Sequence, residues 1–142
     1  MSETAIETRS VVVERSLPHA PAKVWRALSE SDLLARWMMP NDFAPQVGRE
    51  FQFRTQPVGH WDGVVDCEVK EVDPPSRMVW RWGTGDLITT ITFTLTPDGA
   101  GSKLRLEQAG FKPEQEMNRK GAEYGMNMMA DRLPGVLEGL DP

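Results

Sequence analysis

The chain has 142 residues, of which 39% are hydrophobic and 26% charged, and its formal net charge at pH 7 is −5. This length fits one domain with a sizeable core. The weak acidity and the lack of a Lys/Arg cluster argue against a nucleic-acid partner, because phosphate binding needs a basic face. No run of about 18 apolar residues is present, so the sequence predicts neither a membrane span nor a membrane partner.

The N-terminus and the cysteine content limit the cellular location and the kinds of disulfide or metal site that are expected. Residues 1–9 are largely polar, include acidic side chains and lack a long apolar stretch. They therefore predict a flexible segment, neither a secretory signal nor a transit peptide, and a cytoplasmic protein. Cys67 is the only cysteine, which excludes an internal disulfide and a thiolate-rich metal site. No His-x-x-x-His spacing or carboxylate cluster is present, so we expect no metal and no cofactor.

The first elements are a strand and two short helices. Residues 11–17 are rich in β-branched types and predict a strand. Pro21 suits a first helical turn, because its missing N–H needs no partner there, and the helix is expected to continue to Leu28. A second helix, with Asp32 in its first turn, is expected to end at Trp37.

The middle of the chain alternates with period two, which is typical of half-buried strands. Turn sequences rich in proline, glycine and aspartate separate the apolar segments. The expected strands lie within residues 49–54, 61–72, 78–82, 91–95 and 104–106.

A long helix closes the chain. Pro113 suits its first turn, whereas Pro134 is expected to kink or end it, because a proline ring clashes with the carbonyl four residues earlier. Apolar residues recur at helical spacing. The face toward the sheet is expected to contain Met117, Gly121, Tyr124 and Met128.

In this order the elements resemble the START-like (SRPBCC) superfamily, and in particular its branch named for the activator of the heat-shock-protein ATPase. The matching segments are Pro21–Leu28, Leu33–Trp37, Val47-Gly48, Gly63, Glu71–Pro75, Met78–Trp82 and the C-terminal helix. The resemblance implies an α+β helix-grip fold and a single domain over residues 1–142. In that fold a curved antiparallel sheet of about six strands wraps around the long C-terminal helix, and two short helices follow the first strand.

One departure from the branch concerns the last helix. Members often carry Gly-Trp where this chain has Gly125-Met126. A flexible thioether in place of an indole changes the shape of the space that the helix covers. The ligand of a relative therefore cannot be transferred to this chain.

A concave sheet closed by one helix favours an apolar cavity, and the main hypothesis is binding of a small, largely apolar molecule without catalysis. For any single candidate residue, core packing is the more common role, so the hypothesis depends on the whole set. Tyr124 is the preferred polar candidate. The candidate ligand-binding residues are Trp37, Phe51, Phe53, Val65, Cys67, Met78, Trp80, Trp82, Ile91, Phe93, Met117, Tyr124 and Met128.

The sequence offers few polar candidates for a site, and for those on strands the register decides whether they face the cavity or the solvent. His19 and His60 lie beside expected turns, where a solvated role is more common than a catalytic one. Arg54, Arg81 and Gln108 would face either the cavity or the solvent, because a single β-bulge reverses the alternation.

Three alternatives remain open. Some START-like proteins are cyclases, aromatases or hydrolases, but such activity needs an acid or base within reach of the substrate, and the pattern shows no committed pair. The resemblance also implies a co-chaperone module with a heat-shock chaperone as partner. Exposed apolar residues near Trp37 would instead mediate a homodimer.

Overall fold

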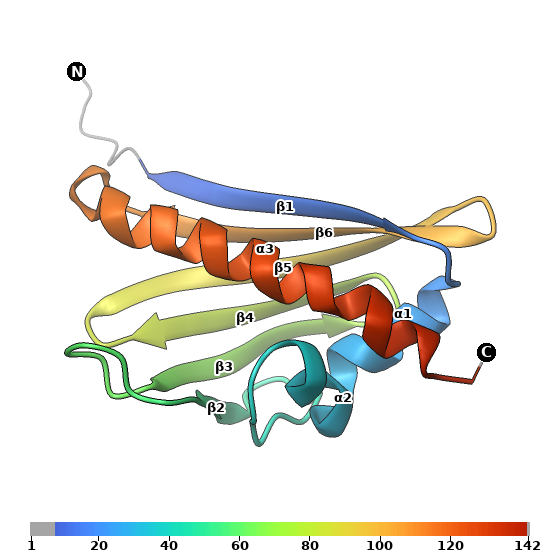
Figure 1. The fold of residues 1–142 in the computed structure, drawn as a ribbon, viewed down its shortest axis with the longest axis horizontal. Helices are drawn as coiled ribbons and strands as arrows, with labels where there is room; N and C mark the ends of the chain where they lie inside the picture. Colours follow the sequence, from blue (N-terminus) through green and yellow to red (C-terminus); the bar gives the residue numbers. More distant parts are fainter. Residues whose placement is uncertain (1–7, 142) are drawn as a thin grey trace.

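The computed structural model describes residues 8–141, which form a curved six-stranded sheet and a long helix lying across its concave face (Figure 1). The strands follow the order β1-β6-β5-β4-β3-β2 and all pair antiparallel. This confirms the expected α+β helix-grip architecture. The elements are β1 (Arg9–Leu17), α1 (Pro21–Ser29), α2 (Ser31–Trp37), β2 (Glu50–Arg54), β3 (Val64–Asp73), β4 (Arg77–Thr84), β5 (Leu87–Asp98), β6 (Gly101–Phe111), the 3-10 helix η1 (Pro113–Gln115) and α3 (Glu116–Glu138).

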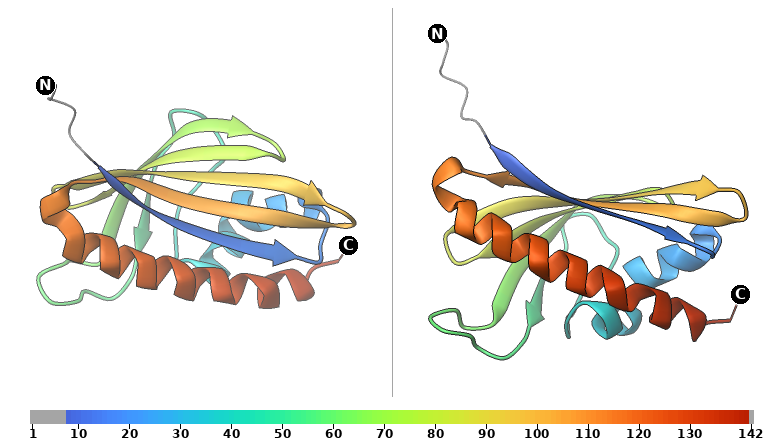
Figure 2. Two further views of the ribbon diagram at one scale, coloured as in Figure 1. Left: turned by 90° about the horizontal axis from the view of Figure 1, so that it is seen from above. Right: turned by 45° about the horizontal axis from the view of Figure 1, so that its top comes forward.

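The N-terminal expectation mostly concerns residues outside the described part. Of the segment 1–9, the structure describes only Thr8 and Arg9, and Arg9 already begins β1. From there β1 runs along one edge of the sheet, beside α3 (Figure 2).

The two short helices are separated by one residue. Pro21 occupies the first turn of α1, as expected. Glu30 has extended backbone angles; its N–H donates to Arg26 O at 2.9 Å, and its own carbonyl accepts from Leu34 N at 2.8 Å. One residue therefore ends α1 and begins α2. Both helices contact α3, and α1 also contacts β5 and β6.

Two β-bulges set which side chains face the concave side. Lys70 is the extra residue in β3, because Val69 pairs with Trp80 and Glu71 with Val79. Gly110, with a φ of 110°, is the extra residue in β6. A bulge shifts the alternation by one residue. Gln108 and Phe111, three positions apart, are consequently both buried.

The register also settles the three polar residues that the sequence left open. Gln108 faces inward. Arg54 is exposed, and Arg81 is half-buried with its Nε 3.7 Å from Glu68 Oε1. The two arginines therefore belong to the convex side of the sheet.

Helix α3 packs through a face other than the one predicted. Its buried residues, Met126, Ala130, Leu133 and Leu137, recur at helical spacing. Met117, Tyr124 and Met128 are 80%, 72% and 42% exposed on the opposite face, so the prediction that they face the sheet was wrong. The helix also does not end at Pro134, but continues to Glu138. Among the described residues, no helix is long and apolar enough to cross a membrane.

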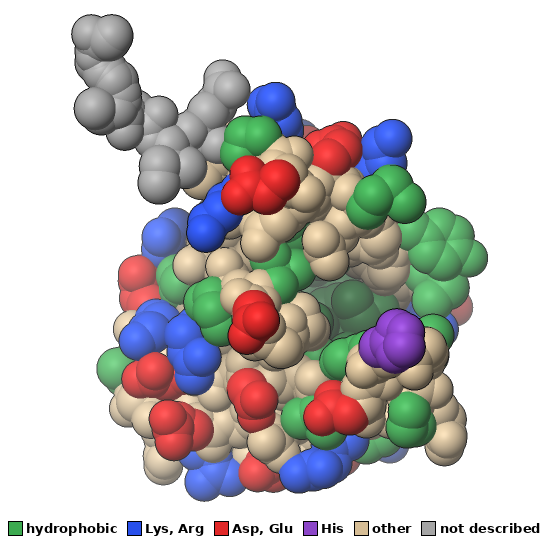
Figure 3. All heavy atoms as spheres, turned by 90° about the vertical axis from the view of Figure 1, so that its left-hand side faces the viewer, with side chains coloured by type: hydrophobic (Ala, Val, Ile, Leu, Met, Phe, Trp, Pro, Cys, Tyr) green, Lys and Arg blue, Asp and Glu red, His purple; other side chains and the backbone are tan. Residues whose placement is uncertain are grey.

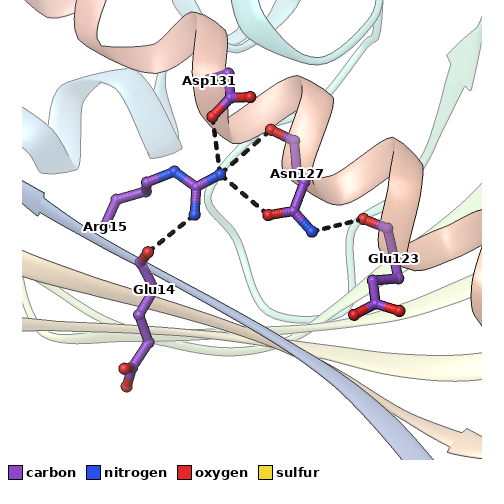
Figure 4. A network of polar contacts seen from close by, with 5 residues as sticks. All are labelled: Glu14, Arg15, Glu123, Asn127 and Asp131. Atoms are coloured by element: carbon purple, nitrogen blue, oxygen red, sulfur yellow. Dashed lines mark hydrogen bonds and ion pairs between the residues drawn. The ribbon is translucent and has the colours of Figure 1, made fainter.

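An arginine ties α3 to the edge strand β1 (Figure 4). Arg15 Nη2 lies 2.8 Å from Asp131 Oδ1 and 3.1 Å from Asn127 Oδ1. Asn127 Nδ2 donates to the backbone carbonyl of Glu123 at 2.9 Å, which fixes the amide that meets the guanidinium. This network holds the middle of α3 against β1.

Candidate ligand cavity

An apolar cavity of about 470 Å³ lies between the sheet and the first half of α3. Viewed from the end of the molecule where α3 begins, the surface is hollowed, and hydrophobic side chains line the hollow (Figure 3). This volume falls within the range of roughly 300–1,000 Å³ that is typical of small-molecule sites. The lining residues are Trp37, Met38, Met39, Trp61, Val65, Trp82, Thr84, Leu87, Ile91, Phe93, Leu106, Gln108, Phe111, Asn118, Gly121, Ala122, Gly125, Met126 and Met129.

Another part of the concave face is filled by an aromatic cluster around Trp80. The Trp80 ring centroid lies 5.3 Å from that of Phe43, 5.2 Å from Phe51, 5.7 Å from Phe53 and 4.5 Å from Phe93. These are the separations at which aromatic pairs attract each other. Phe93 also lines the cavity, so it lies at the boundary between the filled and the open part.

The predicted site residues fall into three groups. Those that line the cavity are Trp37, Val65, Trp82, Ile91 and Phe93. Those that are buried in the core without lining it are Phe51, Phe53, Cys67, Met78 and Trp80. Those that lie on the exposed face of α3 are Met117, Tyr124 and Met128.

Trp37 packs inward. Its side chain is fully buried, and its Nε1 donates to Ala27 O at 2.9 Å. The neighbouring Met38 is buried and Met39 is half-buried, and all three residues line the cavity. The expectation of an exposed apolar surface at Trp37 was therefore wrong, and with it the predicted basis for a homodimer there.

Several lining residues were missed by sequence reasoning. Phe111 faces inward only because Gly110 is an extra residue in β6. Met126 and Met129 line the cavity from α3, although neither was among the candidate ligand-binding residues. Trp61 was expected to begin a strand, but β3 begins at Val64. Trp61 lies in the preceding loop, where its Nε1 donates to Val64 O at 3.0 Å.

The polar groups of the wall are neutral. Gln108 is 4% exposed and donates through Nε2 to Thr89 Oγ1 at 2.9 Å. Thr89 in turn donates to Trp82 O at 3.3 Å. Of the other two polar lining residues, Thr84 is half-buried and Asn118 is exposed. Among the described residues, none that lines the cavity is titratable.

Two acidic groups on the elements around the cavity, Cys67 of β3 and Glu116 of α3, have shifted pKa values. Burial raises the pKa of the Cys67 thiol well above its usual range, and the smaller effect of Arg81 opposes that rise. In the first turn of α3, hydrogen bonds from Arg119 lower the pKa of Glu116. Within residues 8–141, no three His, Cys, Asp or Glu side chains gather as a metal ion would require.

A curved sheet closed by a long C-terminal helix, with a cavity between them, defines the helix-grip class of proteins. The family model described as "Activator of Hsp90 ATPase homolog 1-like protein" matches residues 18–138. The protein MLL2253 from Mesorhizobium loti is 40% identical, with a TM-score of 0.85, over 94% of this chain and 100% of that one. The chain therefore belongs to the Activator of Hsp90 ATPase homolog 1-like family.

More distant solved structures share the fold. The Aha1 dimer from Colwellia psychrerythraea is 18% identical with a TM-score of 0.79, over 92% of this chain and 97% of that one. DynU16, a putative protein in the dynemicin biosynthetic locus, is 24% identical with a TM-score of 0.76, over 92% of this chain and 47% of that one. At these identities the likeness concerns the fold alone. No curated protein matches the chain.

Proposed function

We propose that the protein binds a small, largely apolar, uncharged molecule in the cavity between the sheet and α3. The observation that carries this proposal is a hollow of about 470 Å³ with a wall of aromatic and aliphatic side chains and few polar groups. Filling it removes apolar surface from water, which contributes roughly 25 cal/mol per Å². A charged ligand would find no countercharge among the described lining residues.

The glycines of α3 support the same proposal. Gly121 and Gly125 line the cavity, and a β-carbon at either position would meet no atom within 4 Å. Glycine inside a helix costs about 1 kcal/mol relative to alanine. The helix thus carries two destabilising residues where larger side chains would project into open space.

Substitution of Met126, which lines the cavity, tests this proposal. The neutral dye Nile red and a library of aromatic compounds are screened by fluorescence and thermal shift. A ligand at a hundred times its dissociation constant stabilises the fold by about 2.7 kcal/mol. We expect Met126→Trp to abolish dye binding, because the indole occupies the space that the thioether leaves open.

Met128→Trp is the matched control. Met128 lies on the exposed side of the same helix and does not line the cavity, so its substitution should leave binding unchanged. Circular dichroism establishes that both variants are folded. Failure of every compound to bind the wild-type protein, or equal binding by the two variants, would contradict the proposal.

An enzymatic role is the first alternative. A relative encoded in a biosynthetic locus supports a connection with small organic molecules. General acid–base chemistry requires a titratable group within hydrogen-bond reach of the substrate, and none lines the cavity among the described residues. Product formation from a bound compound, followed by mass spectrometry, would favour the enzyme over the binding protein.

A chaperone partner and a homodimer are further alternatives that the family invites. The name of the family supports the chaperone partner. Its test is whether a saturating concentration of this protein stimulates the ATPase activity of a heat-shock chaperone. The dimeric Aha1 structure and the exposed apolar stripe of Met117, Tyr124 and Met128 on α3 support the second. Light scattering of the wild-type protein and of a Tyr124→Ser variant tests whether this stripe joins two copies.

A further inference from the structure

Gln108 is the deepest polar side chain of the cavity wall. It extends from β6, whose neighbours are β1 and β5, and only 4% of its surface is exposed. The other lining side chains of β5 and β6 are all apolar: Leu87, Ile91, Phe93, Leu106 and Phe111. A primary amide in such surroundings is costly unless each polar atom finds a partner.

The orientation of the amide is fixed by its neighbour. The Thr89 hydroxyl donates its only proton to Trp82 O, so it accepts, through Oγ1, from the group that faces it. Only the nitrogen of Gln108 can donate to that oxygen. The amide carbonyl oxygen, Oε1, must therefore point away from Thr89.

Oε1 has no partner of its own. Within residues 8–141 no hydrogen bond reaches it. Within residues 8–141, Trp80 Nε1 is the only fully enclosed side-chain polar atom that lacks a hydrogen-bond partner. Gln108 Oε1 also lacks a partner, so it is not fully enclosed. Gln108, which lines the apolar cavity, therefore has an accessible acceptor atom, Oε1, with two lone pairs.

We propose that Gln108 is the residue that determines ligand specificity, and that it selects an uncharged aromatic or aliphatic molecule with one hydrogen-bond donor, such as a phenol or an alcohol. This inference rests on the proposed function and names the chemistry of its ligand. The ligand hydroxyl donates to Oε1, while its hydrocarbon part contacts the apolar wall. A site with one buried polar group rejects analogues that leave this group unpaired.

The test compares three probes that share one naphthalene ring and differ at one substituent: 2-naphthol, naphthalene and 2-methoxynaphthalene. Their dissociation constants are measured by displacement of Nile red. One net neutral hydrogen bond corresponds to an affinity ratio of roughly three- to tenfold. We expect wild-type protein to prefer 2-naphthol over both other probes by this ratio.

Two variants assign the preference to Gln108. Gln108→Met keeps the length of the side chain but removes the acceptor, so 2-naphthol should lose its advantage while naphthalene binds at least as well. Thr89→Val removes the group that orients the amide. The amide can then turn, and 2-methoxynaphthalene should gain affinity relative to 2-naphthol. Thermal unfolding establishes whether each variant is folded. If Gln108→Met does not fold, the relative affinities measured with Thr89→Val decide the test.

The outcomes separate the two proposals. Equal affinity of wild-type protein for all three probes, or a preference for 2-naphthol that survives Gln108→Met, overturns the role of Gln108 and leaves the binding function intact. No displacement of Nile red by any probe, together with dye binding that Met126→Trp does not reduce, overturns the cavity as a binding site and this inference with it.

Discussion

Trp80 packs in the core and does not line the cavity. Its indole Nε1 is enclosed without a partner among the described residues, which costs about 1–3 kcal/mol. Its ring packs against four phenylalanines, and each such pair contributes about 0.5–1.5 kcal/mol beyond its burial. The packing outweighs the unpaired donor, so the sequence prediction of Trp80 as a lining residue is replaced by a structural role.

Cys67 is expected to be unreactive in the folded protein. It is buried on β3, and burial raises the pKa of its thiol, so the nucleophilic thiolate does not form at neutral pH. A water-soluble disulfide reagent should label it only after unfolding in denaturant. Rapid labelling of the native protein would show that the concave face opens.

The same pKa shift predicts how stability depends on pH. The folded thiol has the higher pKa, so its contribution is complete below the ordinary thiol pKa of 9.0 and is lost as the pH rises above that value. The free energy of unfolding of wild-type protein should fall more steeply above pH 9.0 than that of Cys67→Ala. Urea titrations at several pH values measure the two slopes; equal slopes would contradict the assignment.

At the scale of elements, α3 carries apolar residues on two faces. Met117, Tyr124 and Met128 recur at helical spacing, and so do Met126 and Leu133 with their neighbours. Periodicity alone cannot choose between two such faces. The choice depends on contacts with β1 and α2, which are distant in sequence, and for this reason the sequence prediction selected the exposed face.

Replacement of the cavity-facing glycines by alanine should stabilise α3 and reduce the capacity of the cavity. Gly121→Ala and Gly125→Ala are each expected to raise the free energy of unfolding by about 1 kcal/mol, because the added methyl meets open space and lowers the entropy lost on folding. The midpoint of thermal unfolding should rise by roughly 2–5 °C. Nile red affinity should fall, since each methyl enters the cavity.

Gly135→Ala is the control within the same helix. A β-carbon there also meets no atom within 4 Å, but Gly135 does not line the cavity. It should give the same rise in thermal stability with no change in dye affinity. Similar losses of affinity in all three variants would place the dye outside the cavity.

The sheet shows which features of an element can be predicted from sequence. The alternation of Phe51 and Phe53 and of Trp80 and Trp82 identified strands and their inward faces, because a period of two is visible locally. The inward turn of Phe111 was not predictable, since it depends on pairing across the Gly110 bulge. Local pattern therefore predicts elements better than it predicts cavity walls.

For the whole molecule, order and type of elements were predicted well, whereas the candidate site was predicted only in part. The two prolines that start helices and the turn sequences act locally, and the resemblance supplied the arrangement. One contribution to the filled part of the concave face comes from Phe43, a residue in an irregular segment that packs against Phe51 and Trp80. No local sequence pattern predicts that such a residue packs into the core.

The distribution of charge predicts that binding of a neutral probe is insensitive to pH and salt. The chain has a formal net charge of −5, but within the described residues no titratable group lines the cavity. The dissociation constant of Nile red should change by less than about twofold between 50 and 500 mM salt and across neutral pH, because exposed charges are screened. A steep pH dependence would instead reveal an ionisable group at the site.

The first half of α3 is held in place at both of its ends. One support is the guanidinium at Asn127 and Asp131, and the other is the short η1 connection to β6. Between the supports, residues 116–125 contain no buried side chain and include both glycines of the cavity wall. This span is therefore the least buried part of α3, and we expect it to move first when a thicker ligand enters the cavity.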